Sequence, residues 1–193
     1  MESMRSFILE YIERFIALSI FLVFLPLIIF MILLIKFSSR GPALFWSVRS
    51  GINGINFYMP KFRTMKVGTP QVATHLLSSP DSHLTSLGVI LRKYSLDEIP
   101  QLISIFQGKM SFVGPRPALF NQEDLIKLRC KYNIDTIKPG LTGWAQVNGR
   151  DELSIEDKVN YEIEYLENQS LKFDLYIIWL TITKTLRREG ISH

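Results

Sequence analysis

The sequence has little of what disulfide scaffolds and zinc centres are built from. Cys130 is the only cysteine, so no internal disulfide can form, which fits a reducing compartment. We expect Cys130 to be a small buried hydrophobic residue. The three histidines, His75, His83 and His193, show no metal-ligand spacing, so surface or capping roles are expected for them.

Signals of nucleic-acid binding are also missing. The net charge is +4 and the pI about 9.2, yet no arginine-rich run or aromatic-spaced basic tract is present. Nor is there a glycine-rich phosphate loop of the Walker or Rossmann type, so a nucleotide would have to be held differently. The net positive charge therefore indicates binding to an anionic membrane surface or to a phosphorylated substrate, and we expect no nucleic-acid partner.

Charge is absent from one long stretch of the chain. Twenty residues without a charged side chain run from Ile16 to Ile35. A straight helix of about 20 residues spans the hydrocarbon core of a bilayer, about 30 Å. The run is too long for a secretory signal peptide, and no small-residue cleavage site follows it. We therefore predict an N-terminal membrane segment over residues 1–40, followed by a domain over residues 41–193.

The path of this segment is open. Pro26 lies at its middle, where it removes a backbone donor and clashes with the carbonyl of Leu22. A helix broken at Pro26 could enter one leaflet and return to the same face, and a kinked spanning helix is the alternative. Positive charge lies on both sides of the run and suits two cytoplasmic ends, at Arg5, Arg14, Lys36 and Arg40.

Beyond the membrane segment the patterns predict an α/β domain, mostly α and irregular in topology. Residues 43–49 are expected to form a short strand or a segment lying at the membrane interface, and 56–66 an extended segment broken by Pro60. Loops are expected over 67–81 and 108–117 and a turn over 138–144. Helices are expected at 82–92, 96–107, 122–132, 155–168 and 173–188. The last helix ends in cations and carries Tyr176 and Trp179, so it suits either an interfacial amphipathic helix or a core helix.

Asp97 and Glu98 are the first candidates for chemistry. Ser95 and Glu98 have the spacing of a capping box, which would place both acids in the first turn of a helix. Pro100 complicates this reading, because proline fits best at the first helical position. Taken alone, adjacent acids at a helix start are usually structural.

Several cations near turn residues could complete a phosphate site. Carboxylates among cations can hold a divalent metal and a diphosphate together. The alternative is that these cations form ordinary salt bridges on the surface. An arginine in a loop bounded by glycine and proline, such as Arg116, can bind phosphate through two parallel hydrogen bonds. The candidates are Lys61, Arg63, Arg92, Arg116 and Arg150.

Four motifs in order resemble one known family. They are KFRTM (61–65), LRKYSLDEIPQL (91–102), GKMSFVGPRP (108–117) and PGLTGWAQVNGR (139–150). The chain resembles the small monotopic phosphoglycosyl transferases, also called the bacterial sugar transferase family, from the membrane segment to the C-terminus. A chance match to four long motifs in this order is very improbable.

The resemblance implies a specific reaction. Asp97 and Glu98 form a dyad with one Mg²⁺, and Asp97 attacks the sugar-bearing phosphate of a UDP-sugar, releasing UMP and leaving a covalent phosphosugar intermediate. Undecaprenyl phosphate then accepts the sugar-1-phosphate, the first membrane step of a cell-surface glycan, glycoconjugate or lipopolysaccharide. The short form of the chain resembles members that use N-acetylated amino-sugars.

The resemblance also implies a place in the cell and a substrate-binding set. The protein is expected at the bacterial inner (cytoplasmic) membrane, with a re-entrant N-terminal helix and the catalytic domain on the cytoplasmic face. Substrate binding is expected from Lys61, Arg63, Arg92, Arg116, Arg150 and Asp174, the last of which matches the family's later acid.

Two positions depart from the family pattern. Leu25 replaces the serine before the breaking proline, which removes a hydroxyl that could satisfy freed backbone groups. Glu162 stands where relatives usually have aspartate, and no role is assigned to it. The rival hypothesis is a non-catalytic membrane-anchored scaffold of the same fold, against which the presence together of Asp97, Glu98 and Arg116 argues. The sequence does not predict the oligomeric state.

Overall fold

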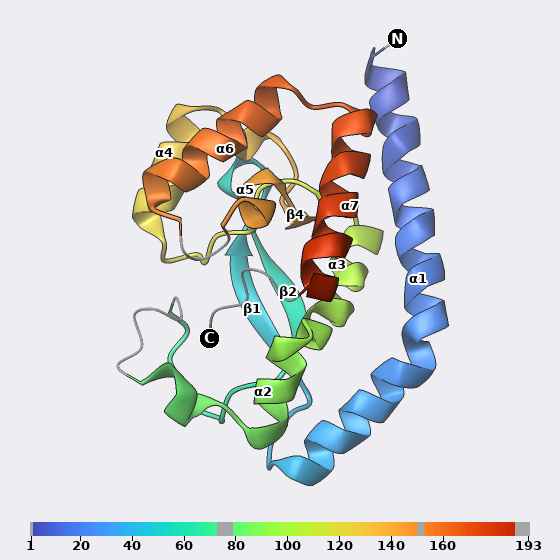
Figure 1. The fold of residues 1–193 in the computed structure, drawn as a ribbon, viewed down its shortest axis with the longest axis vertical. Coiled ribbons are helices and arrows are strands. Elements are labelled where there is room, and N and C mark those ends of the chain that lie inside the picture. The colour runs from blue at the N-terminus through green and yellow to red at the C-terminus, as the bar shows by residue number, and fades with distance from the viewer. Residues whose placement is uncertain (1, 73–78, 150–152, 188–193) are drawn as a thin grey trace. The chain divides into compact units, whose positions relative to one another are not determined.

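The computed structural model describes residues 2–72, 79–149 and 153–187 (Figure 1). Within these residues the chain is mostly helical and carries two small two-stranded sheets, as the sequence predicts. It divides into two compact units, the first made of residues 1–48 and 58–108 and the second of residues 49–57 and 109–193. The expected boundary near residue 40 stays a prediction.

The first unit begins with α1 (Glu2–Ser38), a helix of 37 residues. At 1.5 Å per residue it is about 55 Å long. Pro26 lies inside α1 without ending it, and Figure 1 shows the helix bend along its length. A proline inside a helix commonly causes such a bend, because it removes one backbone hydrogen bond and crowds the preceding turn. Whether α1 spans a bilayer or re-enters one face stays a prediction.

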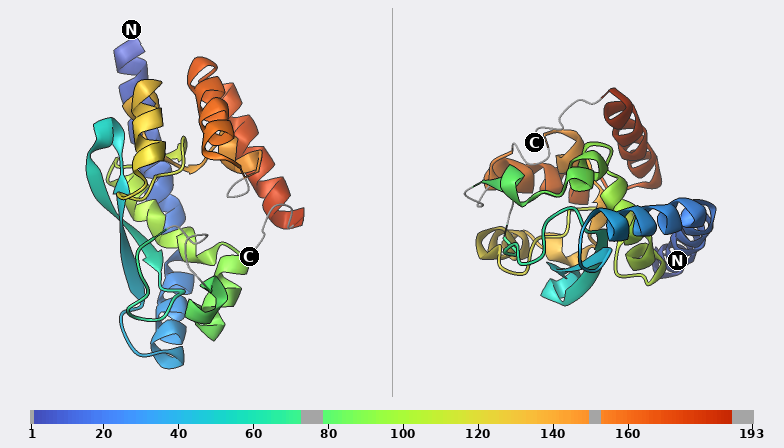
Figure 2. Two further views of the ribbon diagram at one scale, coloured as in Figure 1. Left: turned by 90° about the vertical axis from the view of Figure 1, so that its left-hand side faces the viewer. Right: turned by 90° about the horizontal axis from the view of Figure 1, so that it is seen from below.

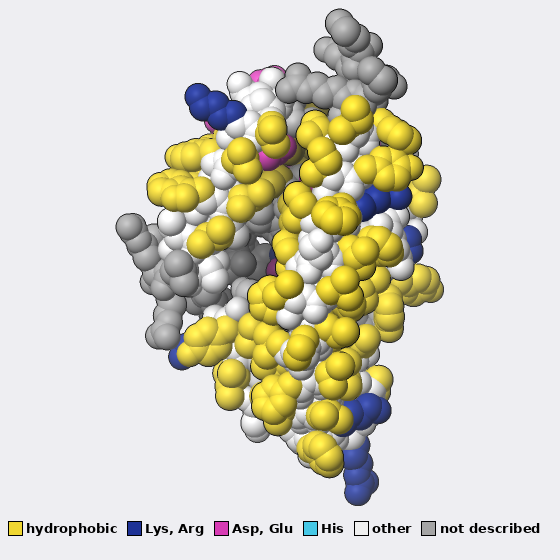
Figure 3. All heavy atoms as spheres, turned by 90° about the vertical axis from the view of Figure 1, so that its right-hand side faces the viewer, with side chains coloured by type: hydrophobic (Ala, Val, Ile, Leu, Met, Phe, Trp, Pro, Cys, Tyr) yellow, Lys and Arg dark blue, Asp and Glu magenta, His cyan; other side chains and the backbone are white. Residues whose placement is uncertain are grey.

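Most apolar side chains of α1 are left uncovered by protein. Among the described residues, the stretch from Phe7 to Ser38 is the one helix long and apolar enough to cross a membrane. Ala17, Ile28 and Ile35 are buried, whereas Val23 is 76% exposed and Phe37 is 87% exposed. Figure 3 shows the face on which α1 lies, and hydrophobic side chains cover most of it. Apolar surface on this scale marks a contact with membrane or partner.

The remaining elements of the first unit surround the buried side of α1. α1 packs against α3 (Leu102–Phe106), and its last turns join a core made with β1, β2 and α2. α2 covers Ser86–Lys93. Burying a side chain such as Phe62, which is 1% exposed, stabilises the unit by about 1.5–3 kcal/mol. The buried members of this core are Ile28, Ile35, Ala43, Phe62 and Leu91.

β1 (Leu44–Ser50) and β2 (Asn56–Phe62) form a two-stranded sheet, joined through the short 3₁₀ helix η1 (Ile52–Gly54). Figure 2 shows the two strands side by side. The expected break at Pro60 is wrong, since β2 continues through it. In a sheet of two strands each strand has a free edge, where a missing backbone donor is tolerated.

Two expected helices of the first unit begin or divide differently. α2 starts four residues later than predicted, because the Thr85 side chain caps it by accepting a hydrogen bond from Gly88 N at 2.9 Å. Residues Pro80–His83 form the 3₁₀ helix η3 instead. The single helix expected at 96–107 is the 3₁₀ helix η4 (Leu96–Gln101) followed by α3. Pro100 lies inside η4, and α-helical bonding begins only after it.

The second unit holds α4 (Glu123–Lys131), α5 (Trp144–Val147), α6 (Ile155–Glu167) and α7 (Leu171–Arg187). The helices expected at 122–132, 155–168 and 173–188 are therefore confirmed within one or two residues. Figure 2 shows α6 and α7 close together, and their Tyr165 and Phe173 rings lie 5.9 Å apart. The 3₁₀ helix η5 (Ile134–Thr136) follows α4.

A parallel pair of short strands lies within this second unit. β3 (Ser111–Val113) and β4 (Gly140–Thr142) pair with Ser111 opposite Gly140. The sequence predicted a loop and a turn at these places, because three-residue strands give no periodic signal. Cys130 also differs from expectation, since it is exposed.

Candidate active site

The two adjacent acids, Asp97 and Glu98, lie in the first turn of η4. The predicted capping box is wrong, because Ser95 adopts a left-handed conformation (φ 52°, ψ 22°) and its side chain caps nothing. The turn is held through the backbone instead, where Glu98 N donates to Ser95 O at 3.2 Å. Asp97 is 8% exposed, so its carboxyl group is nearly buried.

Lys61 on β2 reaches one of these acids. Its Nζ lies 3.0 Å from Glu98 Oε1, and the two side chains are 14% and 15% exposed. An ion pair this shielded is screened less by solvent than a surface pair. The pair therefore places a positive charge at the acid turn.

Arg63, two residues further on, points to a different element. Its NH1 donates to Arg40 O at 2.8 Å, and its NH2 donates to Ser39 O at 2.9 Å and lies 2.7 Å from Ser39 Oγ. The guanidinium thus binds the peptide carbonyls just after α1, and the residue is only 6% exposed. This contact fixes the chain leaving α1 to the end of β2.

Thr64 joins the same segment to α2. Its carbonyl oxygen accepts a hydrogen bond from Thr85 N at 2.9 Å, and its Oγ1 accepts one from Arg92 Nε at 3.0 Å. A Cβ added at Gly88 would collide with the Thr64 carbonyl group, so α2 comes this close only because residue 88 is glycine. The segment at the end of β2 therefore contacts three elements of the first unit: Lys61 contacts η4, Arg63 the chain just after α1, and Thr64 α2.

Arg116 and Asp174 belong to the second unit and are described within it. Arg116 follows β3 in the Gly114–Pro115 loop, and Gly140 N donates to Pro115 O at 2.9 Å. A side chain at Gly140 would collide with the backbone of Gly114. β4 can therefore pack directly against this loop only because residue 140 is glycine.

Asp174 lies on α7 and accepts a hydrogen bond from Tyr165 OH at 2.8 Å. Burial raises the pKa of the Asp174 carboxyl group above the usual 3.8, while the Tyr165 hydrogen bond opposes that rise. Asp174 therefore connects α6 and α7 in the structure, and its expected role in substrate binding stays a prediction.

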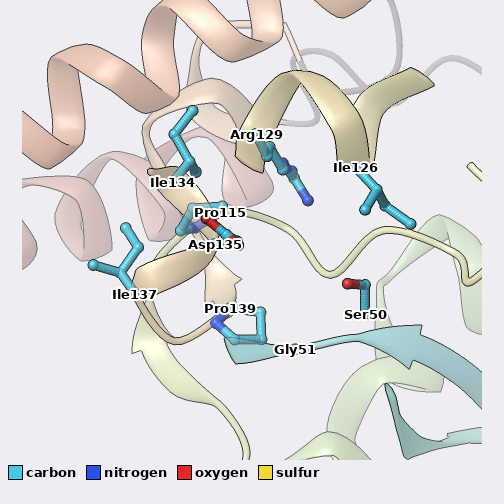
Figure 4. A pocket seen from close by; sticks show the side chains of 9 residues that line it. All are labelled: Ser50, Gly51, Pro115, Ile126, Arg129, Ile134, Asp135, Ile137 and Pro139. Carbon is cyan, nitrogen blue, oxygen red and sulfur yellow. The ribbon is translucent and has the colours of Figure 1, made fainter. Parts of the chain in front are cut away.

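Glu162, for which the sequence suggested no role, forms a buried ion pair. Arg129 Nε donates to its Oε2 at 2.8 Å, and Arg129 NH2 lies 2.5 Å from its Oε1. The side chains are 9% and 2% exposed, so this pair joins α4 to α6 inside the unit. Arg129 also lines a cavity of about 30 Å³ beside Asp135 and Pro115 (Figure 4). That volume has room for about one ordered water.

Within the first unit, three cations of the predicted set have described contacts. Lys61 pairs with Glu98, Arg92 Nε donates to Thr64 Oγ1, and Arg63 binds the carbonyls just after α1. Arg150 lies outside the described residues. The sequence analysis did not single out Thr64, Tyr165 or Arg129. Only Thr64 stood inside a recognised motif, and no local pattern connects Arg129 to a partner 33 residues away.

The acid pair fits Mg²⁺ in its donor chemistry. Among the described ranges, no group of three or more histidine, cysteine or acidic side chains could enclose a metal ion. Mg²⁺ does not need such a cage, since it is usually held by one or two carboxylates together with substrate phosphates. Two neighbouring carboxylates beside a lysine match a metal site that a diphosphate substrate completes.

Comparison with known proteins gives the family. The bacterial sugar transferase family matches residues 4–188. The uncharacterized sugar transferase EpsL of Bacillus subtilis is 39% identical over 86% of this chain and 81% of its own length. The exopolysaccharide production protein ExoY of Rhizobium meliloti is 37% identical over 88% of this chain and 81% of its own length.

A longer relative has a named reaction. The UDP-glucose:undecaprenyl-phosphate glucose-1-phosphate transferase of Escherichia coli is 38% identical over 86% of this chain, which covers only 37% of that protein. The chain belongs to the bacterial sugar transferase family and is an enzyme of the phosphoglycosyl transferase class.

Proposed function

We propose that the enzyme transfers a sugar-1-phosphate from a UDP-sugar to undecaprenyl phosphate and releases UMP. The observation that carries this proposal is the acid turn, in which nearly buried Asp97 adjoins a Glu98 paired with Lys61 at 3.0 Å. The reaction named for the Escherichia coli relative agrees with that chemistry. The product is a lipid-linked sugar diphosphate that starts a cell-surface glycan.

Asp97 acts as the nucleophile in this proposal. One carboxylate oxygen attacks the phosphorus that carries the sugar, a new O–P bond forms, and the bond to the bridging oxygen breaks. UMP leaves with that oxygen. A phosphate oxygen of the lipid then attacks the same phosphorus and releases the Asp97 carboxylate. No net proton is consumed, because the lipid phosphate takes the place on phosphorus that the phosphate of UMP leaves.

Charge neutralisation is the second requirement of phosphoryl transfer. Asp97 and Glu98 would hold Mg²⁺ with the diphosphate, and the ion would supply charge neutralisation on the phosphate oxygens. Lys61 holds Glu98 in place through its 3.0 Å contact. Binding of the anionic substrate is assigned, as a proposal, to Arg63, Arg92, Arg116 and Arg150 with Asp174.

The membrane position follows from the substrates. A nucleotide-sugar is soluble in water and the lipid acceptor is not, so the site must lie at the membrane surface. α1 supplies the anchor through its exposed apolar side chains. α7 presents Leu175, Tyr176 and Trp179, which are 58%, 47% and 57% exposed and suit an interfacial helix. We place the acid turn on the cytoplasmic face of the inner membrane, with α1 re-entrant.

The sugar has two candidates. An N-acetylated amino-sugar, which the family resemblance implies, stays a prediction. The Escherichia coli relative carries glucose in its name, and this chain covers only 37% of it. UDP-glucose is therefore the direct competitor of UDP-N-acetylated amino-sugars in any substrate panel.

The test is UMP release by the purified, detergent-solubilised enzyme with Mg²⁺, undecaprenyl phosphate and a panel of UDP-sugars. Release with one or a few sugars, lost in Asp97→Asn and retained in Asp124→Asn, is the expected result. Asp124 is an exposed acid of α4 and controls for the loss of one surface charge. Full release from Asp97→Asn would remove the proposed nucleophile, and no release from folded protein with any sugar would remove the reaction.

A further inference from the structure

A groove lies between the last turns of α1 and the segment that enters β1, entirely within the first unit. It is lined by Ile32 and Lys36 of α1 and, from the following segment, by residues that include Ala43, Phe45 and Trp46. Its volume is about 460 Å³. Sites for small organic ligands occupy about 300–1,000 Å³, so the groove is large enough for part of a lipid.

The lining of this groove, the α1–β1 groove, is apolar with one cation. Phe45 is 38% exposed and Trp46 is 47% exposed, so two aromatic rings present surface that the protein leaves uncovered. Lys36 is the charged side chain of the lining and is itself exposed. Lys36 lies in the last turn of an apolar helix and Trp46 on the strand that follows it, and both residue types are typical of the membrane–water interface. The lining therefore suits a hydrocarbon chain that ends in an anionic group.

The walls of the groove are held in place by Arg63. Its backbone N donates to Ala43 O at 2.8 Å, and its guanidinium binds Ser39 O and Arg40 O. The turn between the two walls is thus fixed by hydrogen bonds before any ligand arrives. A preformed groove costs less ordering free energy on binding than a flexible one.

One short segment contacts both the groove walls and the acid turn. Lys61, which pairs with Glu98, precedes Arg63 by two residues, a separation of about 7 Å along an extended chain. The contacts that hold the groove walls and the contact that holds Glu98 therefore come from neighbouring residues.

We propose that the α1–β1 groove binds the phosphate-proximal part of the isoprenoid chain of the lipid acceptor, with Lys36 pairing with its phosphate before transfer. This inference rests on the proposed function, because it gives the acceptor of that reaction its binding site. An ordinary anionic phospholipid shares the same chemistry, and the experiment below separates the two.

The experiment measures KM for undecaprenyl phosphate, as a mole fraction in mixed micelles, together with KM for the UDP-sugar. Lys36→Glu and Trp46→Ser raise KM for undecaprenyl phosphate, by about tenfold for the lost phosphate pair. Both leave KM for the UDP-sugar unchanged, which also shows that the variants fold.

Two matched controls lie outside the groove lining. Arg40→Glu reverses a charge at the same membrane end, and Phe37→Ser removes an aromatic side chain that is 87% exposed. Both keep the wild-type KM for undecaprenyl phosphate. Equal increases in Arg40→Glu and Lys36→Glu would mean general surface attraction and would overturn the groove assignment.

Phospholipid competition decides the occupant. Replacing phosphatidylcholine by phosphatidylglycerol in the micelle leaves KM for undecaprenyl phosphate unchanged if the groove selects the isoprenoid phosphate. An increase seen in the wild type and absent from Lys36→Glu would assign the groove to bulk anionic lipid and overturn the proposal. An inactive wild type would defeat the proposed function itself, whereas an active wild type with unaffected groove variants defeats only this inference.

Discussion

Arg63 donates to the backbone carbonyl of Ser39 across 24 positions of sequence, at 2.9 Å, and a second guanidinium nitrogen reaches Arg40 O at 2.8 Å. The residue therefore holds the chain just after α1, because the Ser39 and Arg40 carbonyls follow the last helical residue, Ser38. This contact joins the KFRTM segment to the end of α1, while Lys61 of the same segment joins it to the acid turn.

Arg63→Ala should lower the free energy of unfolding by about 2 kcal/mol, since it leaves two partly buried hydrogen bonds without their charged donor. Arg63→Lys should recover only part of that loss, because one ammonium group cannot reproduce the two parallel donors of a guanidinium. Denaturant unfolding in detergent measures both. Arg40→Ala, whose side chain is exposed, is the control and should stay near the wild type. Equal stability of Arg63→Ala and the wild type would contradict this role.

The Lys61–Glu98 pair gives a second prediction. Lys61→Met should reduce kcat more than it reduces stability, because the fixed charge at the acid turn is lost while the strand remains. The exchanged variant Lys61→Glu with Glu98→Lys should restore stability through a reversed pair but not kcat, since the acid would no longer adjoin Asp97. Steady-state kinetics and thermal unfolding of the single and double variants separate the two effects. Recovery of kcat in the exchanged variant would show that only pairing matters.

The buried Arg129–Glu162 pair should contribute to folding and not to chemistry. Removing one partner leaves an unpaired buried charge, so Glu162→Gln or Arg129→Met should cost about 3–5 kcal/mol. Replacing both residues with apolar side chains should cost much less. The exposed pair Lys127–Glu123 at 3.0 Å is the matched control, worth about 0–1 kcal/mol. Folded variants should keep the wild-type KM for the UDP-sugar, and a selective change in that KM would mean that Glu162 touches substrate.

Local signals in the sequence predicted the long elements well. The uncharged run gave α1, and the amphipathic patterns of α4, α6 and α7 gave helices within one or two residues of those observed. The capping box at Ser95 failed because the pattern S-x-x-E does not reveal a left-handed backbone at the serine. The short strands β3 and β4 were missed because they depend on pairing between distant segments.

The motifs name the residues of the candidate site but not the contacts that these residues make. Motif order identified Lys61, Asp97 and Glu98, and the structure pairs two of them. The motifs could not show that Arg63 binds the chain just after α1, because the donor and its acceptors are more than twenty residues apart in the sequence. Long-range partners of this kind follow from tertiary packing, for which one sequence holds no periodic signal.

Asp174 gives a prediction for pH. Its pKa in the folded protein is raised by burial, with the Tyr165 hydrogen bond opposing the rise, so the folded state holds this proton more tightly than the unfolded state. The contribution of Asp174 to stability is therefore fully present below the unfolded pKa, near 3.8, and is lost as pH rises through the folded pKa. Asp174→Asn cannot titrate, and its amide oxygen can still accept the Tyr165 hydrogen bond.

The stability of the wild type relative to Asp174→Asn should consequently fall as pH rises across that window and become constant above it. Tyr165→Phe removes the group that lowers the folded pKa, so it should extend the fall to higher pH, while the start of the fall at the unfolded pKa is unchanged. Unfolding temperatures of the three proteins, measured from pH 4 to pH 8 in one detergent, test both statements. All other titrating groups are common to the wild type and Asp174→Asn, so their effects cancel in the difference. A difference that grows with pH would mean that the carboxylate, rather than the acid, is the form that the α6–α7 contact stabilises.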